Sequence, residues 1–394
     1  MSKTAVRLNG LRESVIREMT RLALEHDAIN LSQGYPDFAP PPEIIEAAHR
    51  ALDDGFNQYA ITWGDPGLRA AIRDKMATRY GLQYDPAREI TVTCGVTEAI
   101  IAALMGIANP GDEVILIEPY HENYLAAAVF AGAKPVFVPL EPPLYELDLD
   151  RLRRVCNPKT RAIILNTPHN PTGRVFSRQE LEGIAELCRE FNTVVVTDEI
   201  YDHIVYDEHM HIPMATLDGM YERTITIGGL GKTFALTGWR LGYACAPEPF
   251  SHALRTVHDF TTICAPAPLQ RAGVAAFALP DSYYAQLKQD YTVRRAKMMG
   301  ILEQAHLRAQ PPEGAYYVLA DFSEWLPTLA GQGIHDDWTF AEFLTTKVGV
   351  AVVPGSSFYH TPGLGKNRVR FAFAKKLETL DAAEERLRRG LESL

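Results

Sequence analysis

Short apolar runs rich in β-branched residues alternate with helical segments between about residues 85 and 250. Each run is short, nearly continuous in apolar residues and bounded by turn residues, which is typical of buried strands. The runs are 89–94, 113–118, 134–140, 161–166, 193–199, 223–228 and 241–246. Strands of this kind, separated by helices, indicate a parallel sheet covered on both faces. We therefore predict an α/β fold with a large domain built on a mainly parallel seven-stranded sheet between helices.

The pattern changes after residue 280. A long polar helix is predicted over 282–309, followed by strand-like runs at 314–322 and 367–374 and by a final amphipathic helix. Such a mixture indicates a smaller α+β domain. The expected division is 1–45 for an N-terminal segment that packs with the small domain, 46–285 for the large domain and 286–394 for the small domain.

Composition excludes several classes of protein. The net charge of -10 is spread along 394 residues, so we expect no nucleic-acid partner. Five cysteines without C-x-x-C spacing predict reduced thiols in a cytoplasmic protein, and we expect no metal site. The best apolar run, 99–108, is too short to span a bilayer, so we expect no membrane partner.

A glycine-rich run at 228–240 ends its glycines in Gly231, Lys232 and Thr233, as the phosphate-binding loop of a nucleotide hydrolase does. That loop needs a further glycine five positions before Gly231, and Thr226 occupies this position. The acidic strand end at Asp198 precedes the lysine, against the usual order in such enzymes. A nucleotide hydrolase is therefore a distant alternative, and the main hypothesis is a lysine that does covalent chemistry.

Polar residues and glycines follow the predicted strands at their carboxyl ends, where ligands bind in parallel α/β sheets. They are Cys94-Gly95, Glu118-Pro119, 166–173, Asp198 and 228–232. We expect five separate loops to assemble one site. The start of the helix after the first of these loops offers outward-facing amides and is an anion site in its own right.

These loops carry side chains that a covalent lysine needs around it. The amide of Asn170 can donate to a phenolate or a carboxylate, and Tyr201 can return to the site of Asp198, three residues before it. Arg240 enters a strand and suits a phosphate, while a buried Arg370 needs an anion. Taken alone, each is also an ordinary turn, cap or surface residue.

In combination, these residues resemble the fold type I aminotransferases of class I/II, which depend on pyridoxal 5′-phosphate. The resemblance covers residues from about 10 to the C-terminus and is greatest to the branch with kynurenine aminotransferase, glutamine transaminase K, and methionine and aspartate aminotransferases. The matching motifs are Asn170-Pro171-Thr172-Gly173, Asp198-x-x-Tyr201, Gly231-Lys232-Thr233, Thr237-Gly238-Trp239-Arg240 and Arg370.

The resemblance implies a role for each residue near the cofactor ring. Lys232 forms the covalent link to the cofactor and moves a proton between Cα and the cofactor's C4′. Asp198 keeps the pyridine nitrogen protonated, so that the ring withdraws electrons. Tyr201 and Asn170 hold the cofactor's phenolate oxygen.

The resemblance also implies a phosphate site and a dimer. Arg240 and the amides that follow Gly95, those of Val96 and Thr97, bind the phosphate. Tyr59 reaches the phosphate of the second subunit, so each active site of the implied homodimer lies at the subunit interface.

For the substrate, the resemblance implies that Arg370 pairs with the α-carboxylate, assisted by Asn170 and the backbone of Gly34. Arg368 is then a structural neighbour. The implied reaction moves an amino group from an L-amino acid to a 2-oxo acid by a ping-pong route.

Three positions depart from the family's pattern. Gly229 replaces a serine that gives a hydroxyl to the phosphate, and His121 replaces an aromatic ring that stacks on the pyridine. Thr97 stands where some aspartate-using relatives have a lysine, which favours neutral donors such as glutamine, methionine or aromatic amino acids. Ile263 and Cys264 match a wall of the pocket in the second subunit. An aspartate aminotransferase and a β-eliminating carbon-sulfur lyase on the same fold stay open as alternatives.

Overall fold

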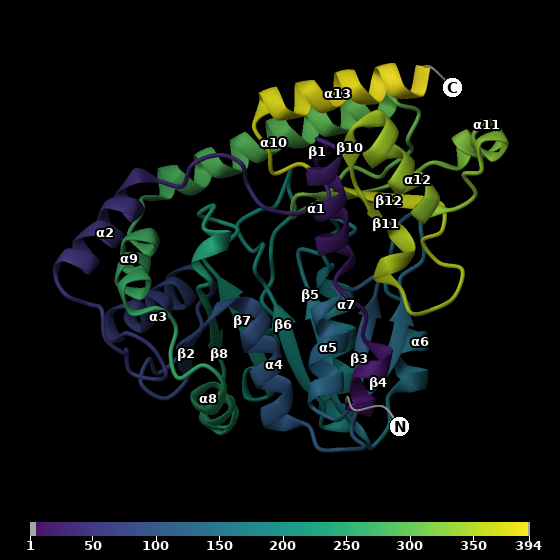
Figure 1. Cartoon of the computed structure of the whole chain (residues 1–394). Helices are drawn as coiled ribbons and strands as arrows, with labels where there is room; N and C mark the ends of the chain where they lie inside the picture. The colour runs from purple at the N-terminus through teal and green to yellow at the C-terminus, as the bar shows by residue number, and fades with distance from the viewer. Residues whose placement is uncertain (1–4, 393–394) are drawn as a thin grey trace.

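The computed structural model describes residues 5–392, so residues 1–4 and 393–394 of the predicted terminal segments lie outside the described residues. Within that range, seven strands form one sheet between helical layers (Figure 1), and each strand coincides with one of the seven predicted runs. In spatial order the strands are β2 (Ile90–Thr93), β8 (Gly242–Cys245), β7 (Thr224–Gly229), β6 (Val194–Asp198), β5 (Thr160–Asn166), β3 (Glu113–Glu118) and β4 (Lys134–Pro139).

Strand direction gives the sheet a polar edge. Six of the seven strands run the same way within the described range, and β8 is antiparallel to both of its neighbours, β2 and β7. The start of β8 therefore lies at the same edge as the carboxyl ends of the other strands. Arg240, just before β8, thus reaches the edge where Asp198 ends β6.

Both faces of the sheet are buried, because successive side chains of a strand point to opposite faces. In β3, Val114 and Leu116 belong to one core, and Ile115 and Ile117 belong to another. The first core is covered by α4 (Gly95–Ile107), α5 (Asn123–Phe130) and α8 (Glu248–Thr261), and the second by α6 (Leu149–Val155) and α7 (Arg178–Phe191).

A third group of helices covers the β2–β8 side of the sheet, namely α2 (Pro42–Asp53), α3 (Pro66–Tyr80) and α9 (Ala267–Phe277). The limits of α3 follow from its sequence. The side chain of Asp65 accepts hydrogen bonds from the first free amides, and Pro66 fits the first helical position. Gly81 ends the helix with φ +70°, a conformation that favours glycine.

The smaller unit packs above the polar edge (Figure 1). Its antiparallel sheet has the order β11 (Val353–Pro354), β12 (Arg368–Ala372) and β9 (Tyr317–Asp321). Its helices are α10 (Asp281–Gln304), α11 (Leu326–Leu329), α12 (Asp337–Phe343) and α13 (Leu377–Glu392).

The N-terminal segment joins this smaller unit. Its short strand β1 (Ile29–Asn30) pairs in parallel with β10 (Val350–Ala351), and Met19 of α1 (Val15–Glu25) is buried in the same core as Phe371. Figure 1 shows α1 running from β1 toward α5. The α1 helix therefore bridges the two units next to the polar edge. No helix within residues 5–392 combines the length and the apolar character needed to cross a bilayer.

Candidate active site

A cavity of about 480 Å³ opens at the polar edge of the large sheet, under the smaller unit. It brings together residues of four of the five predicted strand ends and of the smaller unit. Glu118 and Pro119 do not line it, and the loop after β3 contributes His121 instead. The predicted residues that line it are Gly34, Gly95, Val96, Thr97, His121, Asn170, Asp198, Tyr201, Lys232, Arg240 and Arg370.

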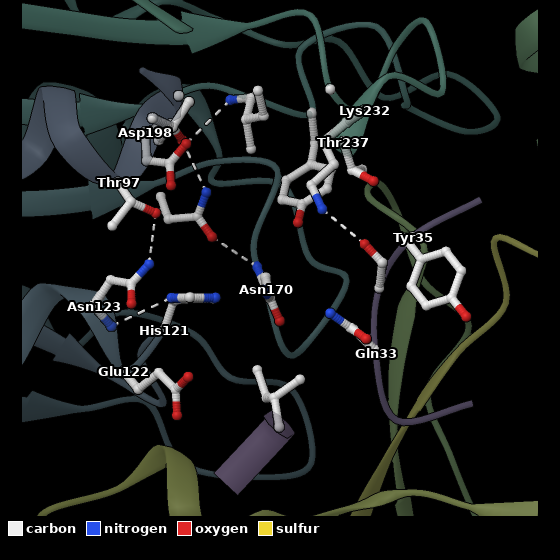
Figure 2. A pocket seen from close by; sticks show the side chains of 18 of the residues that line it. Gln33, Tyr35, Thr97, His121, Glu122, Asn123, Asn170, Asp198, Lys232 and Thr237 are labelled. Atoms are coloured by element: carbon white, nitrogen blue, oxygen red, sulfur yellow. Dashed lines mark hydrogen bonds between the residues drawn. The ribbon is translucent and has the colours of Figure 1, made fainter. Parts of the chain in front are cut away.

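Lys232 extends into this cavity from the loop after β7. Its Nζ donates to the backbone oxygen of Gly34 at 2.7 Å (Figure 2), and the hydroxyl of Tyr316 donates to the same oxygen at 3.1 Å. Only glycine fits at position 34, because a Cβ atom there would lie 1.8 Å from the hydroxyl of Tyr317. The N-terminal segment and the smaller unit thus fix the position of the amine.

Asp198 is the last residue of β6 and is nearly buried, with 7% of its surface exposed. One carboxylate oxygen accepts from the hydroxyl of Tyr124 at 2.7 Å and the other from the amide of Ile200 at 3.2 Å. Burial nevertheless raises the pKa of this carboxyl to about 6. An acid held in this way has a strong preference for a cationic partner.

Tyr201, Asn170 and Arg370 form the opposite wall. The hydroxyls of Tyr201 and Tyr317 are 3.0 Å apart, and burial raises the pKa of Tyr201 well above its ordinary value. The side-chain oxygen of Asn170 accepts from Arg370 at 3.0 Å. The backbone N–H of Asn170 donates to the side-chain oxygen of Asn166 at 2.8 Å. These contacts join the loop after β5 to the smaller unit.

Arg370 is 1% exposed and lies between the rings of Tyr317 and Phe358, with its guanidinium carbon 4.5 Å and 4.9 Å from their centroids. It donates to the carbonyl of Ser32, and burial lowers its pKa. Among the described residues its Nε has no hydrogen-bond partner. A buried cation in this state is suited to bind an anion. Arg368 is instead paired with Asp321 across the sheet at 3.0 Å.

A second group of donors suited to an anion lies at the N-terminus of α4. Gly95 has φ +81°, and a Cβ atom there would lie 2.4 Å from Nη2 of Arg240. Arg240 has φ +53°, and its Nη1 donates to the carbonyl of Thr237 at 3.0 Å. The guanidinium and the free amides at the start of the helix therefore converge. Gly229 contributes no hydroxyl, and a Cβ atom there would lie 3.0 Å from the carbonyl oxygen of Leu241.

Beside the carboxylate of Glu122, the wall near α5 carries the uncharged side chains of His121, Asn123 and Thr97. Burial lowers the pKa of His121 to about 3, so its imidazole is uncharged at neutral pH, and its Nδ1 accepts from the amide of Asn123 at 3.3 Å. The side-chain amide of Asn123 donates to the hydroxyl of Thr97 at 2.8 Å (Figure 2).

Three predicted residues lie outside the cavity of their own chain. The side chain of Tyr59 is on the surface with 79% exposed, and Ile263 is 47% exposed with φ +70°. Cys264 contacts Cys94, whose Sγ is 3.8 Å from the Cys264 carbonyl oxygen. Phe260 nearby is 87% exposed, so this side of the molecule carries bare apolar side chains.

Sequence reasoning did not single out several residues of the site. Tyr124 supports Asp198 from a helix, and Tyr317 supports Tyr201 from the smaller unit. Asn166 belongs to the predicted strand-end stretch 166–173, but no role was assigned to it. The first turn of α1 contributes Ile16 and Arg17, and no pattern in the sequence marked them.

Comparison with known proteins agrees with this geometry. The family model described as aminotransferase class I and II matches residues 26–387. A probable N-succinyldiaminopimelate aminotransferase from Mycobacterium tuberculosis is 41% identical over 98% of each chain. Kynurenine–oxoglutarate transaminase 3 from Homo sapiens is 38% identical, with 97% of this chain and 89% of that protein covered. A solved structure of a methionine aminotransferase from Escherichia coli is similar with a TM-score of 0.91 and 34% identity, covering 99% of this chain and 100% of that one.

The match extends over both structural units and excludes the nucleotide-hydrolase alternative. It agrees with the resemblance that the sequence motifs indicated. The chain therefore belongs to the aminotransferase class I and II family, and it is a transaminase that depends on pyridoxal 5′-phosphate.

Proposed function

We propose that this enzyme moves the amino group of an L-amino acid to a 2-oxo acid in two half-reactions and prefers donors with a neutral side chain. The observation that carries the proposal is the convergence of Lys232, Asp198 and Arg370 on one cavity. The neutral wall of Thr97 and Asn123 supports the substrate preference. Glutamine, methionine and aromatic amino acids are donors of this kind.

The residues around α4 fit the phosphate of the cofactor. Because Gly95 has no Cβ atom, the guanidinium of Arg240 lies close to the backbone at the start of α4. We propose that Arg240 and the amides of Val96 and Thr97 bind the phosphate there. Gly229 gives no hydroxyl to this site, which corresponds to one hydrogen bond fewer, worth about 1 kcal/mol.

The residues at the end of β6 fit the ring of the cofactor. When bound, the cofactor supplies an electron sink that stabilises negative charge at the substrate's Cα. The buried carboxyl of Asp198 suits a protonated ring nitrogen, because a cation would relieve the cost of its ionisation. Tyr201 and Asn170 would hold the phenolate oxygen, and the neutral ring of His121 would lie on a face of the pyridine.

Lys232 has two proposed roles. Its amine would hold the cofactor covalently, and when free it would take the proton from the substrate's Cα and deliver it to the cofactor's C4′. The backbone oxygen of Gly34, 2.7 Å from Nζ, holds the amine over the cavity.

Arg370 would bind the α-carboxylate of either substrate. Its fork donates two parallel hydrogen bonds to a carboxylate, and the buried Nε without a protein partner supports this role. Asn170 and the backbone of Gly34 would assist Arg370 in binding this carboxylate. The side-chain oxygen of Asn170 is already 3.0 Å from Nη1 of Arg370. Amino acids and 2-oxo acids share this carboxylate, so one arginine serves both half-reactions.

We also propose a homodimer with active sites at the interface. The exposed ring of Tyr59, together with Phe260 and Ile263, supports a contact through this side of the molecule. In this arrangement Tyr59 would bind the phosphate of the partner chain, and Cys264 would lie near its substrate pocket. Five free cysteines support a cytoplasmic location. The division into 1–45, 46–285 and 286–394 also stays a proposal, and α10 crosses its second boundary.

The two alternatives on the same fold differ in substrate or in the fate of the Cα carbanion. An aspartate aminotransferase would need a cation for a short distal carboxylate, and Thr97 supplies none. A carbon-sulfur lyase begins with the same proton removal but expels a thiol from Cβ, so product analysis separates it from a transaminase.

The test measures kcat/KM for glutamine, methionine, phenylalanine and aspartate with one oxo-acid acceptor, in the wild type and in Thr97→Lys. We expect the best neutral donor to exceed aspartate by about tenfold or more, and Thr97→Lys to reduce that ratio. Lys232→Ala should lose nearly all turnover.

Two results would overturn the proposal. If aspartate is the fastest donor in the wild type, the substrate preference is wrong. If Lys232→Ala keeps substantial turnover, the role of Lys232 is wrong. Accumulation of pyruvate, ammonia and a thiol from a cysteine conjugate, without transamination, would favour the lyase.

A further inference from the structure

The first turn of α1 is held against the mouth of the cavity. Ser14 caps the helix by accepting from the amide of Arg17 at 3.3 Å. The hydroxyl of Ser14 donates to Glu122, and the amide of Val15 donates to the other carboxylate oxygen of Glu122 at 3.2 Å. Glu122 directly follows His121 in the cavity wall (Figure 2), and its bonds to Ser14 and Val15 therefore fix α1 to the site.

This turn adds an apolar side chain and a cation to the cavity. Ile16 and Arg17 both line it, and Arg17 is exposed at the rim. No carboxylate within residues 5–392 lies within 4.0 Å of the Arg17 guanidinium. Arg21, one turn further along α1, is instead bound to Glu13, with Nη2 3.1 Å from a carboxylate oxygen.

Three of the four cationic side chains in the described lining have a role in the proposed function, and Arg17 has none. In the proposed function Lys232 bonds to the cofactor, Arg240 binds its phosphate and Arg370 binds the α-carboxylate. Both oxygens of Glu122 are occupied by α1. Arg17 is the remaining cation among the described lining residues. A surface arginine of this kind is often only solvated, but this one is both exposed and part of the cavity lining.

We propose that Arg17 binds the distal carboxylate of a dicarboxylic substrate whose methylene chain lies along Ile16. The inference rests on the proposed function and specifies a second substrate class: acids longer than aspartate, such as glutamate, 2-aminoadipate and their 2-oxo acids. A ping-pong enzyme admits two substrates to one pocket in turn, so a neutral donor and an acidic acceptor can share it. A neutral side chain leaves Arg17 in water at no cost.

The experiment compares glutamate with glutamine, which differ only in the charge of the distal group. For each enzyme, kcat/KM is measured in the half-reaction without an oxo acid. Arg17→Gln should lower the glutamate-to-glutamine ratio about fivefold, a typical effect for an exposed charge pair. Arg17→Lys should keep most of the ratio, and Arg21→Gln, on the same helix, should keep all of it. An unchanged ratio in Arg17→Gln would overturn the proposal.

A binding measurement separates this inference from the proposed function. Calorimetry of the cofactor-loaded enzyme with glutarate and pentanoate gives the contribution of the second carboxylate without turnover. We expect the advantage of glutarate to fall in Arg17→Gln and to weaken with salt in the wild type. Equal advantages in the wild type and Arg17→Gln would overturn the role of Arg17, even if transamination is observed. Failure of the wild type to convert any amino acid would refute the proposed function, and the calorimetric comparison would still decide the role of Arg17.

Discussion

The buried carboxyl of Asp198 should destabilise the enzyme when the cofactor is removed. Burial raises its pKa to about 6 in spite of the hydrogen bonds from Tyr124 and Ile200. In the unfolded chain the carboxyl titrates near its ordinary value of about 3.9. The folded state therefore binds the proton more tightly than the unfolded state does.

The sign and size of the effect follow by linkage. Well below pH 3.9 both states are protonated, and Asp198 has no effect on stability. Above pH 6 the carboxyl is ionised in both states, and its burial costs about 3 kcal/mol, since each pKa unit corresponds to about 1.36 kcal/mol. Roughly half of this cost is already present at pH 5. Asp198→Asn removes the titration, so its stability relative to the wild type should rise by about 1.5 kcal/mol between pH 5 and pH 8.

The assay is urea unfolding of the cofactor-free wild type and Asp198→Asn across that pH range. Asp202→Asn is the matched control, because burial opposes ionisation of Asp202 but the charges of His203 and Lys75 hold its pKa well below the usual range. A carboxyl with a lowered pKa stabilises the folded state at pH values above its pKa in the unfolded chain. This contribution is lost as pH falls below that value. The control should therefore lose stability by an amount that stays nearly constant between pH 5 and pH 8, because the contribution of Asp202 is lost only below its unfolded pKa of about 3.9.

A difference between Asp198→Asn and the wild type that does not change with pH would refute the reasoning. In the cofactor-loaded enzyme the advantage of Asp198→Asn should vanish at pH 8, because a ring nitrogen cation would then pair with Asp198. Persistence of the advantage in the loaded enzyme would show that Asp198 does not face the cofactor's nitrogen.

Three further outcomes are expected. His121→Phe should leave the pH titration of the cofactor's absorbance unchanged between pH 6 and 9, since the pKa of His121 is about 3; loss of a transition near neutrality would contradict this. Gly229→Ser should lower the free energy of unfolding, measured in urea, by about 1–3 kcal/mol, because its Cβ would lie 3.0 Å from the carbonyl oxygen of Leu241. Unchanged stability would show that the serine is accommodated without strain. Lys75→Met should lower the free energy of unfolding by about 3–5 kcal/mol, because Nζ lies 2.5 Å from the buried carboxylate of Asp202. Adding Asp202→Asn should restore part of this stability. A loss that Asp202→Asn does not relieve would contradict the charge explanation.

The sequence was sufficient for the strands because parallel strands buried on both faces are continuous apolar runs. Run 241–246 has the same pattern as the others, and its antiparallel direction as β8 is not encoded in that pattern. The direction of β8 depends on the path of the connection between β7 and β8, residues 230–241. This detail matters, because it is what carries Arg240 to the polar edge.

The candidate site was predictable where chemistry follows a strand end. Asp198 and Lys232 satisfy that rule, and both line the cavity. Residues that support them from other elements were missed. Tyr124 lies on a helix and Tyr317 in the smaller unit, and their contacts depend on packing between units rather than on spacing in the chain. Arg17 was missed because an arginine on an amphipathic helix is normally solvated.

The central claim is that Lys232 and its surroundings carry out transamination. The most direct measurement is the visible absorbance of the purified enzyme while single amino acids are added without an oxo acid. We expect a neutral donor to remove the band of the lysine-bound cofactor and to release one equivalent of 2-oxo acid. If the band persists with every amino acid, or is absent after pyridoxal phosphate is supplied, Lys232 does not carry out transamination.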